Sequence, residues 1–308
     1  MKKHKICKIL LVILAIFLCV AFYELLGICV AYKKQPEVSN TTKKETKNGS
    51  WNECSENTER AVIIEKNPEA LLQRVRLIKN AKKEIILSTF AFQSDESGKL
   101  ILGALHDAAD RGVHIRLLVD GMESWIDMEG NPYFYGLSSH ENVEIKLYNK
   151  ANPLKPWKMM GRMHDKYLIA DGKRYILGGR NTYNYFLGDF PGHKNYDRDV
   201  LVVCDEPEKE NSVNQLLEYF ETIWNQEDSG YFHNNKKLAN RKSVKNAVLE
   251  LQNGYQKYFE ENKERICDTD YTDETFETEK IALVSNPIHT GSKEPVVWYQ
   301  LGELMKNA

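Results

Sequence analysis

The stretch His164-Asp-Lys-Tyr-Leu-Ile-Ala-Asp171, followed by Gly178-Gly-Arg-Asn181, decides the fold of this chain. The apolar run at residues 167–170 predicts a strand, in which alternate side chains leave the same face. His164 and Lys166 stand two positions apart at the head of this run. We therefore expect both on one face, where an imidazole and an ammonium can meet the same anion.

The residues that follow predict a hairpin that ends in ligand-binding groups. The chain turns at Asp171, and a second strand starts at residues 174–177. Gly178 and Gly179 remove side chains where a backbone can approach a ligand closely. Asn181 can donate its amide to a phosphate oxygen. Together these residue types predict half of a phosphoryl-transfer site.

The pattern H-x-K-x4-D-x6-G-G-x-N resembles the HKD signature of the phospholipase D superfamily. The flanks Arg162-Met163 and Gly178-Gly-Arg-Asn181 resemble its bacterial cardiolipin synthase branch. The resemblance implies a phospholipase D-like α/β sandwich and a mechanism without a metal or other cofactor. One histidine attacks phosphorus to form a phosphohistidine, and a second histidine protonates the leaving alcohol. Water or another alcohol then releases the phosphatidyl group.

Carried onto this chain, the resemblance makes His164, Lys166 and Asp171 the catalytic motif. His164 would be the nucleophile or the general acid, and Asp171 would be mainly structural. Lys166, Asn181 and Gly179 would bind the substrate phosphate. Fixed donors suit a phosphodiester because they stabilise the negative charge that develops on its oxygens. A histidine suits because its neutral form is nucleophilic near pH 7.

The same resemblance implies an acidic residue at the entrance of the next strand, where it orients a catalytic imidazole. Asp197 and Asp199 both precede the apolar run at residues 200–203. Asp197 is favoured and Asp199 stays open. The alternative for either residue is an ordinary solvated strand entrance.

A complete site of this family has two motifs, and residues 1–308 contain one. The sequence Leu77-Ile-Lys-Asn-Ala81 is echoed by Leu304-Met-Lys-Asn-Ala308, and each copy closes a helical pattern. We therefore predict that residues 280–308, with a strand at residues 280–285, are the start of a truncated second repeat. The second half of the site would come from the missing C-terminal repeat or from a homodimer.

The N-terminus predicts a membrane anchor. Four lysines precede an apolar stretch at residues 9–32, which as a helix is long enough to cross a bilayer. Glu24 interrupts the stretch away from its centre, where an acidic residue is tolerated. The lysines before the stretch outnumber the two just after it, which favours a cytoplasmic N-terminus. We predict a single-pass protein of the cell membrane, with residues 1–32 as a signal anchor and the catalytic domain outside the cytoplasm.

Composition and patterning predict one main domain with appendages. With 42% hydrophobic residues, a chain of 308 residues can bury a substantial core. Residues 33–59 are polar and predict a flexible tether. Strands alternate with helical patterns in residues 60–204, which predicts an α/β domain around a mixed sheet. Residues 205–279 predict a helical connector that ends in an exposed acidic linker.

Cysteines and histidines outside the motif predict no metal site. Cys54, Cys204 and Cys267 match no zinc spacing, and Cys54 with Cys267 is a candidate disulfide pair. His106 is expected on the surface flank of a helix and His140 in a loop. Neither has a partner at the spacing of metal ligands.

Three functions stay open at this point. The leading hypothesis is a membrane-anchored phosphatidyltransferase or phosphodiesterase, cardiolipin synthase-like, that acts on a phosphatidylglycerol-like phospholipid. The alternatives are an HKD nuclease completed by dimerisation and a catalytically incomplete half of a two-motif enzyme. A net charge of −2 argues against nonspecific nucleic-acid binding. The cationic and apolar loop at residues 152–162, which includes Trp157, predicts either lipid contact or an ordinary packed loop.

Overall fold

The computed structural model describes residues 2–31, 33, 36–49, 59–204 and 211–307. The chain divides into two compact units. The sheet unit comprises residues 49–150 and 163–284 and contains the HKD motif. The anchor unit comprises residues 1–48, 151–162 and 285–308.

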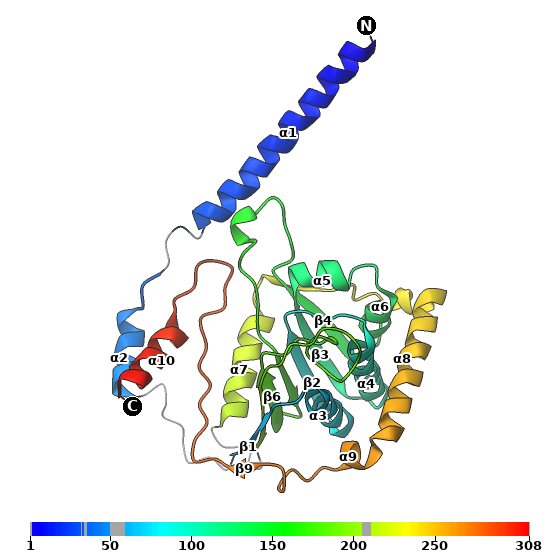
Figure 1. The fold of residues 1–308 in the computed structure, drawn as a ribbon, viewed down its shortest axis with the longest axis vertical. Coiled ribbons are helices and arrows are strands. Elements are labelled where there is room, and N and C mark those ends of the chain that lie inside the picture. Colours follow the sequence, from blue (N-terminus) through cyan, green and yellow to red (C-terminus); the bar gives the residue numbers. More distant parts are fainter. Residues whose placement is uncertain (1, 32, 34–35, 50–58, 205–210, 308) are drawn as a thin grey trace. The chain divides into compact units, whose positions relative to one another are not determined.

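A nine-stranded mixed sheet runs through the sheet unit, in the order β8-β4-β3-β2-β5-β6-β7-β1-β9 (Figure 1). The central strands β2, β3 and β4 are parallel, and the other neighbouring pairs are antiparallel. The strands are β1 (Glu59–Ile64), β2 (Glu84–Thr89), β3 (His114–Asp120), β4 (Val143–Tyr148), β5 (Tyr167–Ala170), β6 (Arg174–Gly178), β7 (Asp199–Cys204), β8 (Ser229–Tyr231) and β9 (Phe276–Glu277).

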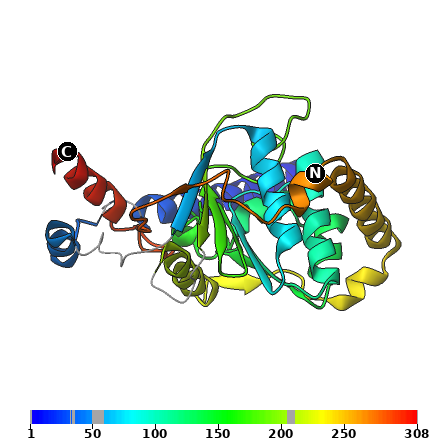
Figure 2. The ribbon, with the colours of Figure 1, turned by 90° about the horizontal axis from the view of Figure 1, so that it is seen from below.

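Helices cover both faces of this sheet (Figure 2). One face carries α3 (Asn67–Asn80), α4 (Glu96–Asp110), α6 (Pro132–Ser138) and α8 (Lys242–Glu261), and the other carries α7 (Ser212–Trp224). Strand β3 illustrates why helices pack on both faces of the sheet. Ile115 and Leu117 are fully buried in the core on the α4 face, whereas the Arg116 guanidinium stacks on Phe220 of α7 at 4.8 Å. Alternate side chains of one strand thus pack against different helices. The predicted α/β fold with a mixed sheet is confirmed.

Two short strands lie where the sequence predicts a helical connector and an acidic linker. β8 pairs with β4 at one edge of the sheet, and β9 pairs with β1 at the other. Between these strands the chain forms η3 (Lys236–Asn240), α8 and α9 (Lys263–Cys267). The sheet therefore extends beyond the boundary expected at residue 204.

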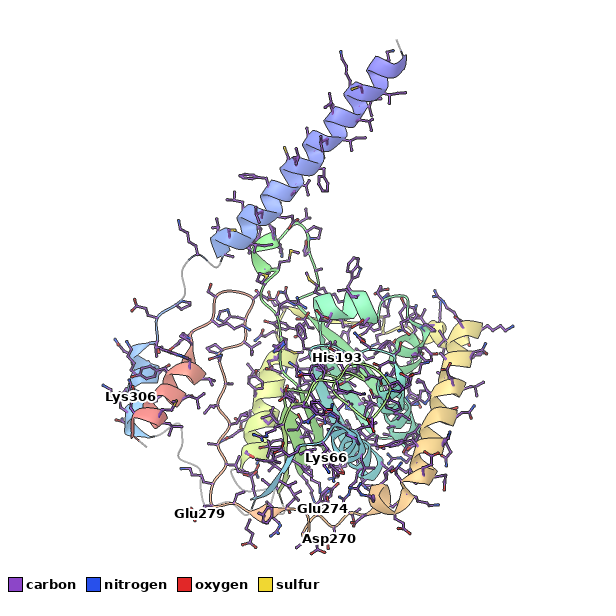
Figure 3. All side chains as sticks on the ribbon, in the orientation of Figure 1. Lys66, His193, Asp270, Glu274, Glu279 and Lys306 are labelled. Atoms are coloured by element: carbon purple, nitrogen blue, oxygen red, sulfur yellow. The ribbon has the colours of Figure 1, made fainter. Side chains whose placement is uncertain are left out.

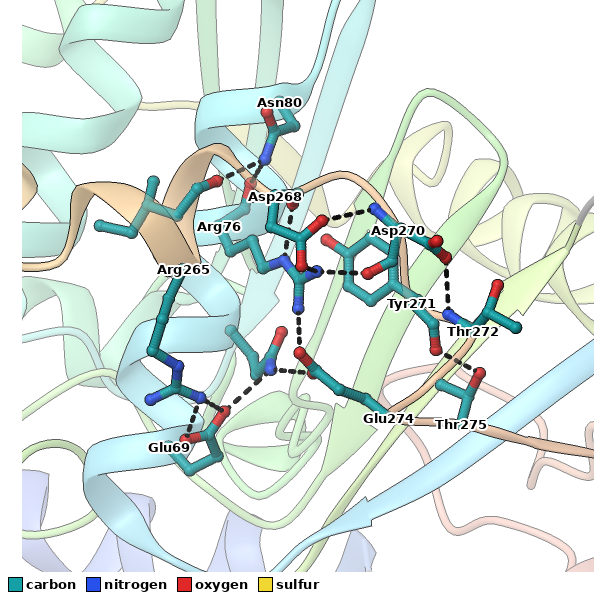
Figure 4. A network of polar contacts seen from close by, with 12 residues as sticks. Glu69, Arg76, Asn80, Arg265, Asp268, Asp270, Tyr271, Thr272, Glu274 and Thr275 are labelled. Carbon is teal, nitrogen blue, oxygen red and sulfur yellow. Dashed lines mark hydrogen bonds and ion pairs between the residues drawn. The ribbon is translucent and has the colours of Figure 1, made fainter.

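The acidic segment at residues 268–279 is docked onto α3 by one arginine (Figure 4). Arg76 is 1% exposed and donates to the backbone oxygens of Asp268 and Asp270 at 2.8 and 2.7 Å, and to Glu274 at 2.9 Å. Its guanidinium also lies 3.9 Å from the ring centroid of Tyr271, which is buried. Asp270 and Glu274 appear together at the lower edge of the unit in Figure 3. Most residues of the segment are exposed, as expected, but the segment is fixed to α3, because the buried guanidinium needs acceptors that this segment supplies.

The strand expected at residues 280–285 is wrong. These residues adopt no regular structure, and the backbone N–H of Leu283 donates to the Gln215 side chain at 2.8 Å. A run of apolar residues alone does not make a strand, because its backbone groups need a neighbouring strand to pair with. The assignment of residues 280–308 to a second repeat remains a prediction.

The anchor unit begins with α1 (Lys2–Ala31), which contains a segment of 27 residues, long and apolar enough to cross a membrane. Helix α2 (Asn40–Asn48) forms within the expected tether, where Ser39 Oγ accepts from the Thr42 backbone N–H at 3.1 Å as an N-cap. The unit also holds η2 (Pro156–Lys158) and α10 (Val296–Asn307). Cys54 lies outside the described residues, so its pairing with Cys267 remains a prediction.

Candidate functional site

The HKD motif lies on the hairpin formed by β5 and β6. The turn between these strands places Asp171 and Gly172 at positive φ angles of 54° and 63°. The Asp171 carboxylate accepts from the backbone N–H groups of Lys82, Lys83 and Glu84 at 2.8, 2.7 and 3.0 Å. Asp171 therefore fixes the start of β2, at the opposite end of β5 from His164. This geometry fits the structural part that the resemblance gives it.

The other motif residues collect at one end of the central strands, which we call the site edge. β2 and β6 end there, and β5 and β7 begin there, because β5 and β7 run antiparallel to their neighbours. Asp120, the last residue of β3, ties the same edge together. Its carboxylate accepts from the backbone N–H of Met163 at 3.1 Å and caps α5 (Gly121–Asp127) through Met122 at 3.0 Å. The residue just before His164 is thus fixed to the sheet.

His164 and Lys166 are brought together by the structure. Lys166 Nζ lies 3.1 Å from His164 Nδ1 and donates to the His164 carbonyl at 2.6 Å. A charged ammonium can only donate, so this contact leaves the imidazole proton on Nε2. That tautomer is the one a general acid needs. Attack on phosphorus through Nε2 needs the proton on Nδ1 instead, with an acceptor other than the ammonium.

Lys166 sits in a poorly solvated environment. It is 5% exposed, and the Phe90 ring centroid lies 5.4 Å from its Nζ. Burial lowers the pKa of Lys166 to about 8, although the nearby carboxylates of Asp165 and Asp197 favour the charged form. The Phe90 ring also meets the His164 imidazole edge to face, with 4.5 Å between centroids. Lys166 is therefore a cation that water shields weakly, close to a candidate nucleophile.

Asn181 is placed by the loop that follows β6. It is 7% exposed, and its side-chain oxygen accepts from the Ala91 backbone N–H at 3.1 Å. This bond orients the amide, and its NH₂ group makes no hydrogen bond to another described residue. The loop itself is held by the parallel bridge between Phe92 and Thr182. Asn181 is thus a preoriented donor at the end of β6.

The glycine pair has a different explanation from the one that the sequence suggests. A Cβ on Gly179 would overlap the Asp197 carboxylate, and a Cβ on Gly178 would overlap that of Asp199. The two glycines therefore let the carboxylates approach the end of β6. Direct contact of Gly179 with a phosphate remains a prediction.

The two candidate histidine-orienting carboxylates have different surroundings. The Asp199 side chain is fully buried and pairs with Arg74 at 2.9 Å and with Arg180 at 3.2 Å. Arg180 also donates to the Ile64 and Glu65 carbonyls, so this ion-pair group joins β1, α3 and β7. Asp197 instead lies against Gly179 and stabilises the charge of Lys166. The structure therefore favours Asp197 as the carboxylate that faces the motif.

Sequence reasoning missed several neighbours of the motif. Phe90 directly follows β2 and Asp120 is the last residue of β3. Such ends of buried parallel strands are where α/β sheets place their sites. Tyr219 donates to Asp165 at 2.7 Å, from a helix that is distant in sequence and gives no local signal. Within the described residues, no group of three His, Cys, Asp or Glu side chains is arranged to hold a metal ion.

Comparison with known proteins identifies the domain. Residues 74–224 match the family model described as cardiolipin synthase, PLD-like domain. This range includes β2 to β7, the motif hairpin and α7. The chain contains a phospholipase D-like domain.

Relatives of the phospholipase D-like domain include cardiolipin synthases. Cardiolipin synthase C of Escherichia coli K12 is 29% identical over 171 residues, which cover 51% of this chain and 34% of the relative. An uncharacterized protein of Helicobacter pylori J99 is 31% identical over 212 residues, covering 64% of this chain and 39% of that protein. The chain thus spans about a third of the length of these relatives. The solved structure of NucT from Helicobacter pylori aligns with a TM-score of 0.44 at 16% identity, over 56% of this chain and 99% of that chain.

Proposed function

We propose that this chain is a membrane-anchored phosphatidyltransferase or phosphodiesterase that acts on phospholipids through a phosphohistidine on His164. Its most specific form is a cardiolipin synthase-like enzyme that uses phosphatidylglycerol. The observation that carries the proposal is the 3.1 Å contact between His164 and the buried Lys166, at a sheet edge that also holds Asn181 and Asp197. The family match and the names of the relatives support a phospholipid as substrate.

Substrate binding would change the partners of the His164 ring. A phosphate oxygen attracts the Lys166 ammonium more strongly than a neutral imidazole nitrogen does, so Nδ1 is released from Lys166. The proton can then reside on Nδ1 and be donated to the Asp197 carboxylate. This leaves the lone pair of Nε2 for attack, while the Asn181 amide donates to a second phosphate oxygen.

The reaction would proceed in two displacements. Nε2 of His164 forms a bond to phosphorus, the bond to the leaving alcohol breaks, and a second histidine donates a proton to that alcohol. An incoming alcohol then gives its proton to the second histidine and attacks phosphorus, which breaks the phosphorus–nitrogen bond. With phosphatidylglycerol as donor and acceptor the products are cardiolipin and glycerol. With water as acceptor the lipid product is phosphatidic acid.

The second histidine would come from outside the motif described here. A second copy of the chain is the simplest source, because a twofold symmetric dimer joined at the site edge brings two His164 residues together. A C-terminal repeat of the same polypeptide, or a separate polypeptide with the matching motif, is another source. Helix α1 would hold the assembly on the membrane that contains the substrate, with the N-terminus in the cytoplasm and the sheet unit outside it.

The test is product analysis with the full chain reconstituted in vesicles that contain labelled phosphatidylglycerol. We expect labelled cardiolipin with release of glycerol, and at least a hundredfold loss of turnover in His164→Ala, on the order of the contribution of a catalytic nucleophile. Phosphatidic acid as the product would identify a hydrolase. Cleavage of single-stranded DNA without lipid turnover would replace the proposal with the nuclease alternative. Equal lipid turnover by His164→Ala would overturn it.

A further inference from the structure

A cavity lies in the helical layer of the sheet unit, away from the HKD site. Its volume is about 430 Å³, which falls within the range of about 300–1,000 Å³ that is usual for small-molecule sites. It is bordered by α4, α6, η3 and α8, which lie side by side in Figure 1. His106 and His140 in its wall lie on segments that lead into the beginnings of β3 and β4, whereas the motif lies where β2 and β6 end.

The two histidines share one carboxylate. Asp110 meets His106 Nδ1 at 3.1 Å with one oxygen and His140 Nε2 at 3.2 Å with the other. The Asn142 backbone N–H donates to His140 Nδ1 at 3.1 Å, so the His140 proton is on Nε2 and both of its nitrogens are occupied. His106 was expected on the surface, but it is 7% exposed because α8 packs over α4.

His106 therefore offers one unused polar atom to the cavity. Its Nδ1–H points to Asp110, which makes Nε2 a hydrogen-bond acceptor in the neutral ring. Nε2 makes no hydrogen bond to any described residue and is not sealed from solvent. The Ser139 hydroxyl, also in the wall, donates to the Tyr135 and Gly136 carbonyls.

The rest of the wall is mostly apolar. Val244, Val248 and Leu249 line the cavity from α8, and Gly136 lies opposite Val248. Leu249 is 57% exposed even though it belongs to this wall. An apolar surface with one oriented acceptor fits a molecule with an apolar body and one donor group. Lys245 also lines the cavity, but it is exposed, so solvent screens its charge. The Asp110 carboxylate contacts the His106 ring directly and disfavours an anionic group at Nε2.

We propose that this cavity binds an apolar alcohol, with its hydroxyl donating to His106 Nε2 and its chain lying along Val244, Val248 and Leu249. A hydroxyl matches the acceptor, and it avoids the cost of placing a second negative charge beside Asp110. An ether of the same length lacks the donor. It should bind about tenfold more weakly, which corresponds to the loss of one hydrogen bond.

The test is photolabelling of the full chain in lipid nanodiscs with a diazirine analogue of octanol, followed by peptide mapping. We expect adducts on the peptide that contains Val244, Val248 and Leu249. Octanol should protect these residues at about tenfold lower concentration than heptyl methyl ether or octanoate. Adducts confined to α1 would mean that the probe only partitions into lipid, and would overturn the proposal.

Variants test the cavity volume and the His106 acceptor separately. Val248→Trp fills the cavity and should abolish the adducts. His106→Phe should remove the preference for octanol over the ether, whereas the matched variant His140→Phe, which also removes one contact with Asp110, should keep it. A thermal unfolding midpoint near that of the original chain shows that each variant is folded. Equal protection by octanol and ether in the unaltered chain, or adducts that persist in Val248→Trp, would overturn the proposal.

Discussion

At the scale of single residues, the site depends on a lysine that is kept away from water. Lys166 is 5% exposed, and burial lowers its pKa to about 8. The charged form therefore dominates below about pH 8 and is lost as the pH rises through that value. Only the ammonium can neutralise a phosphate oxygen, so under the proposed function the pH dependence of substrate binding would report on this side chain.

We predict that the KM for phosphatidylglycerol rises above about pH 8 while Lys166 loses its proton. Below about pH 8, Lys166→Met should raise KM by about ten- to a hundredfold, the effect of losing a charged hydrogen bond, and this difference should shrink as the pH rises above that value. Lys166→Arg keeps its charge, so its KM should not rise as the pH passes about 8. Steady-state kinetics across this pH range measure the difference. An unchanged alkaline limb in Lys166→Arg would assign the titration to another group.

Substitution by asparagine should affect stability at one of two neighbouring aspartates and turnover at the other. Asp199→Asn removes a buried charge from Arg74 and Arg180, so it should lower the free energy of unfolding by about 3–5 kcal/mol. Asp197→Asn should leave stability nearly unchanged and lower kcat, because it removes the negative charge that would stabilise the proton on His164 Nδ1. Denaturant titration and turnover assays on both variants test this pair. A normal kcat in a folded Asp197→Asn variant would remove Asp197 from the site.

At the scale of elements, the sequence predicts what local patterns encode. The strands at residues 143–148 and 167–170 and the turn at Asp171 are read from apolar runs and turn residues. β8 and β9 are missed because three-residue and two-residue strands form only against a neighbour already in place. The expected strand at residues 280–285 fails for the converse reason, since no strand of the described residues pairs with it. For the site, the motif residues are predictable, but Tyr219 and Phe90 are brought in by tertiary packing.

The docking of the acidic segment onto α3 should depend on the shape of one guanidinium. Arg76 reaches two carbonyls and Glu274 while stacking on Tyr271, and a lysine cannot make these contacts at once. We expect Arg76→Lys to cost about 2 kcal/mol or more. Amide exchange should accelerate in residues 268–275 and β9 more than in β3. Uniform exchange across the sheet would show that the segment is held by other contacts.

At the scale of the whole molecule, the chain combines an apolar N-terminal helix with a phospholipase D-like domain. Helix α1 has the length and composition of a membrane span. The loop that carries η2 lies against this helix within the anchor unit, where Tyr23 donates to the Leu154 carbonyl at 3.0 Å. Trp157 in this loop is 46% exposed, which suits a residue at a membrane surface. An enzyme of membrane lipids gains from both features, because its substrate is confined to the bilayer.

Removal of residues 1–33 should release the protein from membranes. The full chain should stay with membranes after an alkaline carbonate wash, because burial of a helix of this length in the bilayer is effectively irreversible. Protease added to intact spheroplasts should cut the sheet unit if it lies outside the cytoplasm. Protection of the sheet unit until lysis would reverse the proposed orientation without affecting the assignment of the site.

The most direct measurement is covalent trapping of the intermediate on His164. The full chain is mixed with phosphatidylglycerol labelled at phosphorus, quenched rapidly, and examined for label that stays with the protein. We predict label that is stable to alkali, labile to acid, and absent from His164→Ala, as expected for a phosphorus–nitrogen bond at this residue. Label retained by His164→Ala, or lipid turnover by that variant at the unaltered rate, would contradict the account.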